Sequence, residues 1–331
     1  MFVLFLTAFL LLAPVPVPGT ILHLSEDDYV YPRISPDGRQ LVVGRAYVRP
    51  EIGETTDVLL IDLAAGTQRL LITREQSEDY ETYETYLVGL EWADGSTVLV
   101  SLSDGDVGVT ELFVEASSGR ILRTVHSEDE LYSNDFAAIA RDAVRYSLDF
   151  TLDELQRSLA TAAKRIDAES ILILRDRFDE KEQALFRINT GERSAERIAT
   201  VPSTLRLADV ARVGGETFAL LLGEGVAEIL VLGRQRASRR ARWDTDPSAG
   251  CARFQPVGGR LLVFLRPCSA AQPVRGELWE LVGNGVVPQF PFAGLDELSA
   301  SADGSRIAVG LWTGEKREVR VLDSSVLRPA S

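Results

Sequence analysis

Acidic residues that end in a tyrosine recur three times in the N-terminal half of this chain. The segments are SEDDY at 25–29, SEDY at 77–80 and SEDELY at 127–132. The residues concerned are Glu26, Asp27, Asp28, Tyr29, Glu78, Asp79, Tyr80, Glu128, Asp129 and Tyr132. Carboxylates that converge from several directions suit Ca²⁺, which takes about six to eight oxygen ligands. They also attract a basic protein, for which tyrosines supply rigid contact area.

We expect these segments to form a docking face for a basic protein or peptide. Two alternatives stay open, namely solvated loop residues without a specific role and a Ca²⁺ site. Later positions with the same character are Asp244, Asp246, Asp296 and Glu297. The chain has two histidines, which excludes a His-rich metal site. We predict no particular residues as metal ligands.

No residue type and spacing in the chain predicts catalysis. A Ser-His-Asp triad would have to use His23 or His126, and closeness in sequence does not create a triad. No Gly-x-Ser-x-Gly nucleophile motif occurs either. We therefore expect a binding protein without catalytic residues.

Composition narrows the class of protein. The chain has 331 residues, 45% of them hydrophobic and 25% charged, which favours a globular protein with a sizeable core. Its formal net charge is −14, so it lacks the basic surface that a nucleic-acid-binding protein needs.

Residues 1–19 resemble a secretory signal peptide. The apolar run MFVLFLTAFLLLA is followed by PVPVPG, and this run is too short for a typical membrane-spanning helix. We expect cleavage after Gly19 and a periplasmic or secreted protein, with no stable membrane insertion after cleavage. The alternative is an uncleaved N-terminal anchor.

A strand–turn–strand phrase repeats along residues 20–331. Its clearest copy is YPRISPDGRQLVVG at 31–44 followed by DVLLIDLAAGTQRLLIT at 57–73, and its last is ELSASADGSRIAVG at 297–310. Asp-Gly and Gly-Gly turns are typical of tight β-hairpins. The expected inner hairpin turns lie at 35–38, 93–96, 140–143, 213–216, 257–259 and 302–305. Repeats of this kind predict an all-β, six-bladed β-propeller.

The last repeat lacks its outer strand, because only SSVLRPAS follows Asp323. The segment TILHLS at 20–25 precedes the first repeat and can supply that strand. We therefore predict a ring closed by the N-terminal strand, which removes an exposed sheet edge.

One segment breaks the β pattern. Thr151 and Glu154 form a capping-box motif, and Leu155, Leu159 and Ile166 fall on one helical face. This pattern predicts a helical insertion at about 151–168 that packs over the rim or contacts a partner.

The two cysteines, Cys251 and Cys268, flank a predicted hairpin, and an exported protein favours a disulfide between them. Two unpaired thiols are the alternative.

Five arginines gather in GRQRASRRARW at 233–243. Strand alternation predicts that Arg234, Arg236, Arg240 and Arg242 share one face of an outer strand. Such charges discourage edge-to-edge pairing. Binding of anionic glycans or lipid headgroups is the alternative.

The phrase SPDGRQLVV…DVLLIDLAAGTQRLL resembles the TolB-type, WD40-like propeller repeat. The segment LEWADGSTVLVSLSDGDVGVTELFVEASSGRILR at 90–123 is similar to blades of the N-terminal propeller of the prolyl oligopeptidase and dipeptidyl peptidase IV family. The resemblance implies a propeller without the hydrolase domain, which binds partners in a bacterial-type cell envelope. Two other functions stay open: a metal-dependent, lactonase-like hydrolase with a channel metal, and a propeller subunit beside a separate hydrolase.

Overall fold

The described part of the molecule is built almost entirely of β-strands. The computed structural model describes residues 20–24, 29–49, 53–75, 86–103, 109–127, 163–167, 170–175, 182–189, 194–267, 276–289, 294–312 and 317–327. Within these ranges the exception is a short 3₁₀ turn at Ser324–Val326. No helix in them is long and apolar enough to cross a membrane.

The strands form six four-stranded antiparallel sheets in the described residues. The first three sheets contain β2 (Tyr29–Ile34), β3 (Gln40–Arg49), β4 (Gly53–Asp62) and β5 (Thr67–Glu75); β6 (Tyr86–Trp92), β7 (Thr97–Ser103), β8 (Val109–Glu115) and β9 (Ile121–Ser127); and β10 (Ala163–Asp167), β11 (Ser170–Arg175), β12 (Glu182–Asn189) and β13 (Ser194–Pro202).

The remaining sheets follow the same order. They contain β14 (Arg206–Val213), β15 (Glu216–Gly223), β16 (Val226–Leu232) and β17 (Ala237–Asp244); β18 (Cys251–Val257), β19 (Arg260–Arg266), β20 (Glu277–Val282) and β21 (Gly285–Pro288); and β22 (Leu295–Ala300), β23 (Arg306–Trp312), β24 (Arg317–Asp323) and β1 (Thr20–Leu24).

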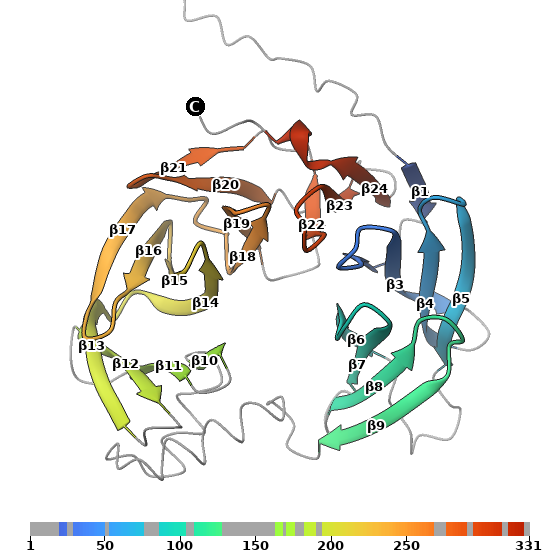
Figure 1. Ribbon diagram of the computed structural model, residues 1–331, viewed down its shortest axis with the longest axis horizontal. Helices are drawn as coiled ribbons and strands as arrows, with labels where there is room; N and C mark the ends of the chain where they lie inside the picture. The colour runs from blue at the N-terminus through green and yellow to red at the C-terminus, as the bar shows by residue number, and fades with distance from the viewer. Residues whose placement is uncertain are drawn as a thin grey trace, which may run out of the picture.

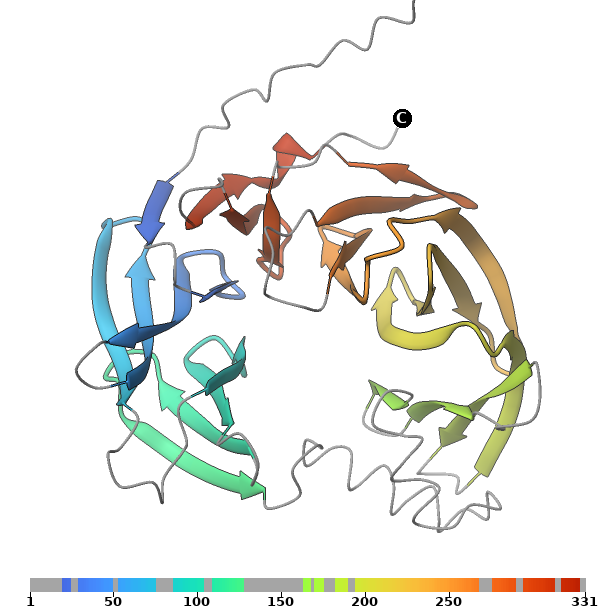
Figure 2. The same ribbon diagram turned by 180° about the vertical axis from the view of Figure 1, so that it is seen from behind.

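The sheets stand radially around a common centre (Figure 1). The first strand of each sheet lies nearest that centre and the fourth lies at the rim, and the view from behind shows the same order (Figure 2). Neighbouring innermost strands touch, as β2 does with β22 and β6, and as β18 does with β14 and β22. This arrangement is that of a β-propeller.

The predicted pairing of the N-terminal strand with the last repeat is confirmed. Strand β1 runs antiparallel to β24, with Thr20 opposite Val321 and Leu24 opposite Arg317. Strand β24 therefore has a partner on both sides, which satisfies backbone groups that an open edge would expose.

The most similar repeats have the same turn. In the first sheet the Ser35 hydroxyl donates to Asp37 at 2.6 Å, and in the last sheet Ser301 donates to Asp303 at 2.6 Å. Gly38 follows with φ +69°, a left-handed conformation that glycine adopts without strain. The turn chemistry that the sequence predicted is thus present at both ends of the chain.

Apolar side chains fill the spaces between neighbouring sheets. One core cluster joins Val42 and Val58 of the first sheet to Leu90, Val98 and other residues of the second. The middle strands read as continuous apolar runs, such as Leu261–Leu265 in β19, because both faces of each sheet are buried.

The helix predicted at 151–168 is wrong at its C-terminal end. Residues Ala163–Asp167 form strand β10, which pairs with β11. Ile166 packs against an inter-sheet core cluster instead of lying on a helical face. Residues 151–162 lie outside the described residues.

The third sheet also begins later than the sequence predicted. Its innermost hairpin is β10–β11, whereas the expected turn at 140–143 lies outside the described residues. A strand from Ile171 was predicted and is present within β11.

Candidate functional site

The acidic segments that the sequence singled out lie mostly outside the described residues. Tyr29 is the first residue of β2. The other nine predicted docking residues, Glu26, Asp27, Asp28, Glu78, Asp79, Tyr80, Glu128, Asp129 and Tyr132, fall in the stretches 25–28, 76–85 and 128–162.

The topology nevertheless shows what these stretches connect. Residues 25–28 follow β1, the rim strand of the last sheet, and precede β2, the innermost strand of the first. The stretches 76–85 and 128–162 make the same kind of connection, from β5 to β6 and from β9 to β10. Each acidic segment therefore falls, in the sequence, between a rim strand and the innermost strand of the next sheet.

A fourth acidic crossing is described. Asp244 ends β17 and is exposed, and Asp246 lies in the turn that follows. The carboxylate of Asp246 accepts hydrogen bonds from the amide and hydroxyl of Ser248 at 2.8 and 2.7 Å. These bonds lower the pKa of Asp246, so its charge stabilises the turn.

Asp296 and Glu297 differ from the expectation of an exposed acidic rim. Both lie within β22 and are buried. The register of β22 shifts between Leu295 and Glu297, so Asp296 is an extra residue in a β-bulge. Because the bulge changes the direction in which side chains point, two consecutive carboxylates are both held close to the neighbouring sheets.

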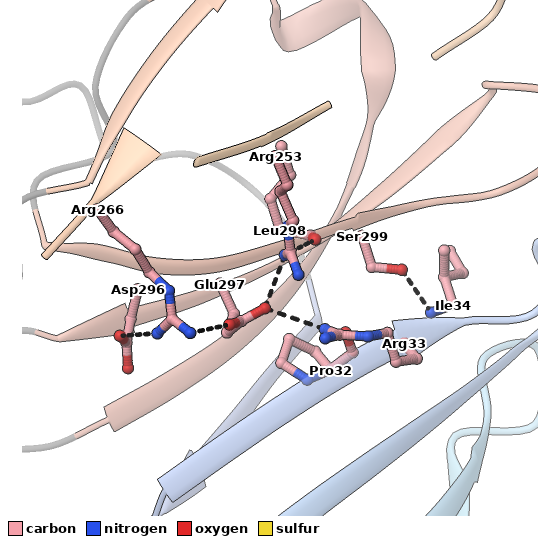
Figure 3. Close-up of polar contacts among 9 residues, drawn as sticks. All are labelled: Pro32, Arg33, Ile34, Arg253, Arg266, Asp296, Glu297, Leu298 and Ser299. Carbon is pink, nitrogen blue, oxygen red and sulfur yellow. Dashed lines mark hydrogen bonds and ion pairs between the residues drawn. The ribbon is translucent and has the colours of Figure 1, made fainter. Parts of the chain in front are cut away.

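Three arginines from other sheets meet Glu297 (Figure 3). Nη1 of Arg33 in β2 lies 3.0 Å from Oε2, and Nη2 of Arg253 in β18 lies 2.7 Å from the same oxygen. Nη2 of Arg266 in β19 lies 3.3 Å from Oε1. Arg253 also donates to the Leu298 carbonyl at 2.6 Å. One carboxylate thus joins the first, fifth and sixth sheets.

Asp296 shares one of these arginines. Its Oδ1 lies 3.7 Å from Nη1 of Arg266, and its Oδ2 lies 3.7 Å from Nε of Arg317 in β24 (Figure 3 shows the first of these pairs). Arg266 therefore bridges the two neighbouring carboxylates.

The two carboxylates respond differently to burial. Burial raises the pKa of Glu297, but Arg253, Arg33 and Arg266 together outweigh it and hold that pKa below its ordinary value. For Asp296 burial dominates, and its pKa is raised despite Arg317 and Arg266. Glu297 is accordingly the carboxylate that the arginines keep ionised.

Polar side chains also tie innermost strands to each other. Ser299 in β22 accepts the Ile34 amide of β2 at 3.0 Å, and Asp209 in β14 accepts the Phe254 amide of β18 at 2.8 Å. Burial raises the pKa of Asp209. These bonds replace the ladder hydrogen bonds that two strands in different sheets cannot make.

The described residues contain no group of three or more His, Cys, Asp or Glu side chains that could hold a metal ion. Asp296 and Glu297, the paired carboxylates of β22, are both engaged with arginines.

The arginine-rich segment does form an outermost strand, β17, as predicted. A register shift opposite Ile229 and Leu230 leaves Arg240 as the bulged residue. Arg239 and Arg242, on either side of it, reach Glu228 at 4.0 and 3.3 Å. The predicted single face for Arg240 and Arg242 is thus wrong at Arg240, which instead lines a hollow of about 380 Å³ between two sheets.

Cys251 begins β18 and lies opposite Arg266 at the end of β19. Cys268 follows two positions later and lies outside the described residues. The predicted disulfide therefore stays a prediction, and the hairpin register is compatible with it.

The sequence did not single out Arg33, Arg253, Arg266 or Arg317. A usable signal was present, since Arg33 and Arg253 are charged residues within innermost strands that are otherwise mostly apolar. Their partner could not be named, because Glu297 is 264 residues from Arg33.

Comparison with known proteins supports the fold and no more. No protein-family model matches the chain, and no curated protein matches it. A chain in "Crystal Structure of Mitotic Checkpoint Complex" is similar with a TM-score of 0.52 and 14% identity, over 98% of this chain and 99% of that one.

Two named propeller structures are also similar. The Dos1 propeller has a TM-score of 0.40 and 12% identity, over 92% of this chain and 95% of that one. TolB from Acinetobacter baumannii has a TM-score of 0.36 and 13% identity, over 88% of this chain and 68% of that one. At such identities the likeness concerns the fold, and these two scores carry no functional argument.

Proposed function

We propose that this chain is an exported, six-bladed, TolB-like propeller, closed by its N-terminal strand, that acts as an interaction module of the cell envelope. It docks a basic protein or peptide on an acidic, tyrosine-rich face and performs no chemistry of its own. Six four-stranded sheets and the β1–β24 pairing support the blade count and the closure.

One observation supports the proposed docking face. All three acidic segments connect a rim strand to the innermost strand of the next sheet. Equivalent connections in a propeller emerge on the same face, so their charges add around the centre of that face. The net charge of −14 adds a general attraction for a basic partner.

The test measures binding of a fluorescent oligolysine peptide at low and physiological salt. The variant carries Glu26→Gln, Glu78→Gln and Glu128→Gln. Three lost charge pairs, each worth about 1 kcal/mol in water, weaken binding at least about tenfold at low salt.

The matched control carries Glu115→Gln, Glu196→Gln and Glu216→Gln, which remove the same charge from described positions outside the acidic segments. Both variants are checked for unchanged thermal unfolding. Equal loss of affinity in the two variants contradicts a docking face, because it shows that only total charge matters.

The alternative is a metal-dependent, lactonase-like hydrolase, which needs several unpaired carboxylates converging near the centre. The two acidic residues of β22 are already shared with arginines, which favours the interaction module. Thermal melts with EDTA and with millimolar Ca²⁺ separate the two functions, since a ligand at about 100 times its Kd stabilises by about 2.7 kcal/mol. A saturable increase in Tm with Ca²⁺ favours the hydrolase.

A further inference from the structure

A hollow lies between the fourth and fifth sheets, which stand side by side (Figure 1). Its volume is about 380 Å³, and its lining comes from the β14–β15, β18–β19 and β20–β21 turns, the strands beside them and Arg240 of β17. Pockets for small molecules typically measure about 300–1,000 Å³. The hollow is therefore large enough for a small organic ligand.

Arg240 lines this hollow without a partner for its charge. It is the bulged residue of β17, whereas Arg239 and Arg242 on either side of it contact Glu228. Its Nε is buried without a hydrogen-bond partner, and Arg240 makes no hydrogen bond or ion pair with any residue that the structure describes. An unsatisfied buried donor destabilises a protein, so a ligand that accepts from this nitrogen removes an unfavourable contribution.

The other charged residues of the hollow leave Arg240 available. Arg260 holds Glu280 through Nε and Nη2 at 2.7 and 2.5 Å, and Gln289 donates to the same carboxylate at 2.9 Å. Glu216 also lines the hollow, but it is exposed, so water and salt screen its charge. Arg240 is therefore the charge that a ligand can pair with.

The charges of both sheets around the hollow are accounted for. The fourth sheet is described throughout, and so are the turns at 213–216, 257–260 and 282–285. The two segments beside the strands of the fifth sheet that the structure does not describe, 268–275 and 290–293, contain no Asp or Glu. The third and sixth sheets lie on the far sides of this pair of sheets (Figure 1).

The rest of the lining is largely apolar. Its apolar side chains, which are buried or half-buried, are those of Val213, Phe218, Leu261, Leu281 and Val282. Burial of hydrocarbon surface against such side chains favours binding. A ligand that carries both an anionic group and a hydrocarbon part thus matches the lining better than an inorganic ion does.

We propose that this hollow binds a small organic carboxylate, whose charged group pairs with Arg240 and whose hydrocarbon part lies against the apolar lining. A guanidinium matches a carboxylate through two parallel hydrogen bonds, and the unpartnered Nε of Arg240 can donate one of them. One guanidinium balances the single charge of a carboxylate, whereas a phosphate group carries about two charges.

The site does not depend on the proposed docking function. Its turns follow β14, β18 and β20, so they lie at the ends of the strands opposite to the connections between sheets. The acidic segments belong to those connections.

The test is isothermal titration calorimetry of the purified protein with sodium phenylacetate and, separately, with sodium hexanoate. Ionic strength is held constant with sodium chloride. The controls are sodium acetate, which lacks the hydrocarbon part, and the alcohols 2-phenylethanol and 1-hexanol, which lack the charge. We expect saturable binding of at least one of the two carboxylates, at least about tenfold tighter than acetate or the corresponding alcohol. Tighter binding of phenylacetate assigns an aromatic ligand, and tighter binding of hexanoate assigns an aliphatic one.

Variants of neighbouring arginines make the result specific. Arg240→Gln weakens binding at least about tenfold. Arg240→Lys keeps the charge but loses the planar donor pair, so it also binds more weakly than the wild-type protein and carries the test if Arg240→Gln does not fold. Arg239→Gln removes the same charge one residue away, outside the hollow, and leaves binding unchanged.

Three results would overturn the proposal. The first is that neither carboxylate binds saturably, and the second is that acetate or the corresponding alcohol binds as tightly as the carboxylate. The third is that Arg240→Gln and Arg240→Lys bind with wild-type affinity, or that Arg239→Gln weakens binding as much as they do.

Discussion

Glu297 Oε2 lies 3.0 Å from Nη1 of Arg33, and this contact joins the innermost strand of the last sheet to that of the first. The same oxygen accepts from Arg253 of the fifth sheet. A single buried carboxylate thus links both ends of the propeller sequence, which makes it a sensitive point for stability.

Replacement of Glu297 is expected to destabilise the protein strongly. Glu297→Gln leaves three guanidinium groups close together without their shared counter-charge, and breaking a buried ion pair costs about 3–5 kcal/mol. Urea unfolding measures the change in free energy. Glu115→Gln, which breaks an exposed pair with Arg120, is the control and costs under about 1 kcal/mol. Equal effects of the two substitutions contradict a special role for Glu297.

Stability is expected to depend on pH through the same carboxylate. Since its pKa is lower in the folded state, Glu297 contributes stability that is fully present above its unfolded pKa of about 4.3 and is lost as pH falls through the folded value. The free energies of unfolding of the wild-type protein and of Glu297→Gln are compared between about pH 6 and pH 3. The difference between them shrinks on acidification; a constant difference refutes the assignment.

Two turns with the same sequence, Ala-Asp-Gly-Ser, are expected to respond differently to alanine. Gly304 has φ +68°, and a Cβ added there would clash with the backbone of Gly258, whereas a Cβ added at Gly95 would lie in open space. Gly304→Ala therefore destabilises by more than about 1 kcal/mol, and Gly95→Ala has little effect. Thermal unfolding of both variants measures the contrast. Similar Tm values show that the turns are equivalent.

Removal of β1 is expected to weaken the last sheet. A chain that begins at Ser25 lacks the partner of β24, which leaves unpaired backbone groups at an edge. Compared with a chain that begins at Thr20, it unfolds at a lower temperature and associates more readily, as measured by calorimetry and light scattering. If the two chains behave alike, closure by β1 adds no stability.

Cys251 and Cys268 are expected to form a disulfide under oxidising conditions. The closed loop is short, and such a bond contributes about 3 kcal/mol. Mass spectrometry of a non-reduced digest detects the linked peptides. Two reactive thiols under denaturing, non-reducing conditions contradict the pairing.

The local elements of this protein could be read from its sequence. The Ser-x-Asp-Gly turns at 35–38 and 301–304, the apolar strands beside them and the pairing of the N-terminal strand were all predicted. The turns and strands depend on residues that are close in the chain. The pairing of the N-terminal strand could be predicted because the last repeat lacks a fourth strand and the segment before the first repeat can supply it. Where the repeat is weak the prediction failed, as at β10, because helix-like apolar spacing occurs in a strand whose tertiary contacts outweigh local preference.

The contacts of Glu297 with Arg33 and Arg253 depend on the tertiary structure alone. Arg33, Arg253 and Glu297 are ordinary charged residues in separate strands, and nothing near any of them in sequence names a partner. They meet because the sheets stand side by side around one centre and because a β-bulge places Glu297 toward its neighbours. The sequence by itself determined hairpins and sheets through turn chemistry and hydrophobic pattern. Only the tertiary structure determined which charges share one buried position, since that depends on contacts between sheets that local sequence does not encode.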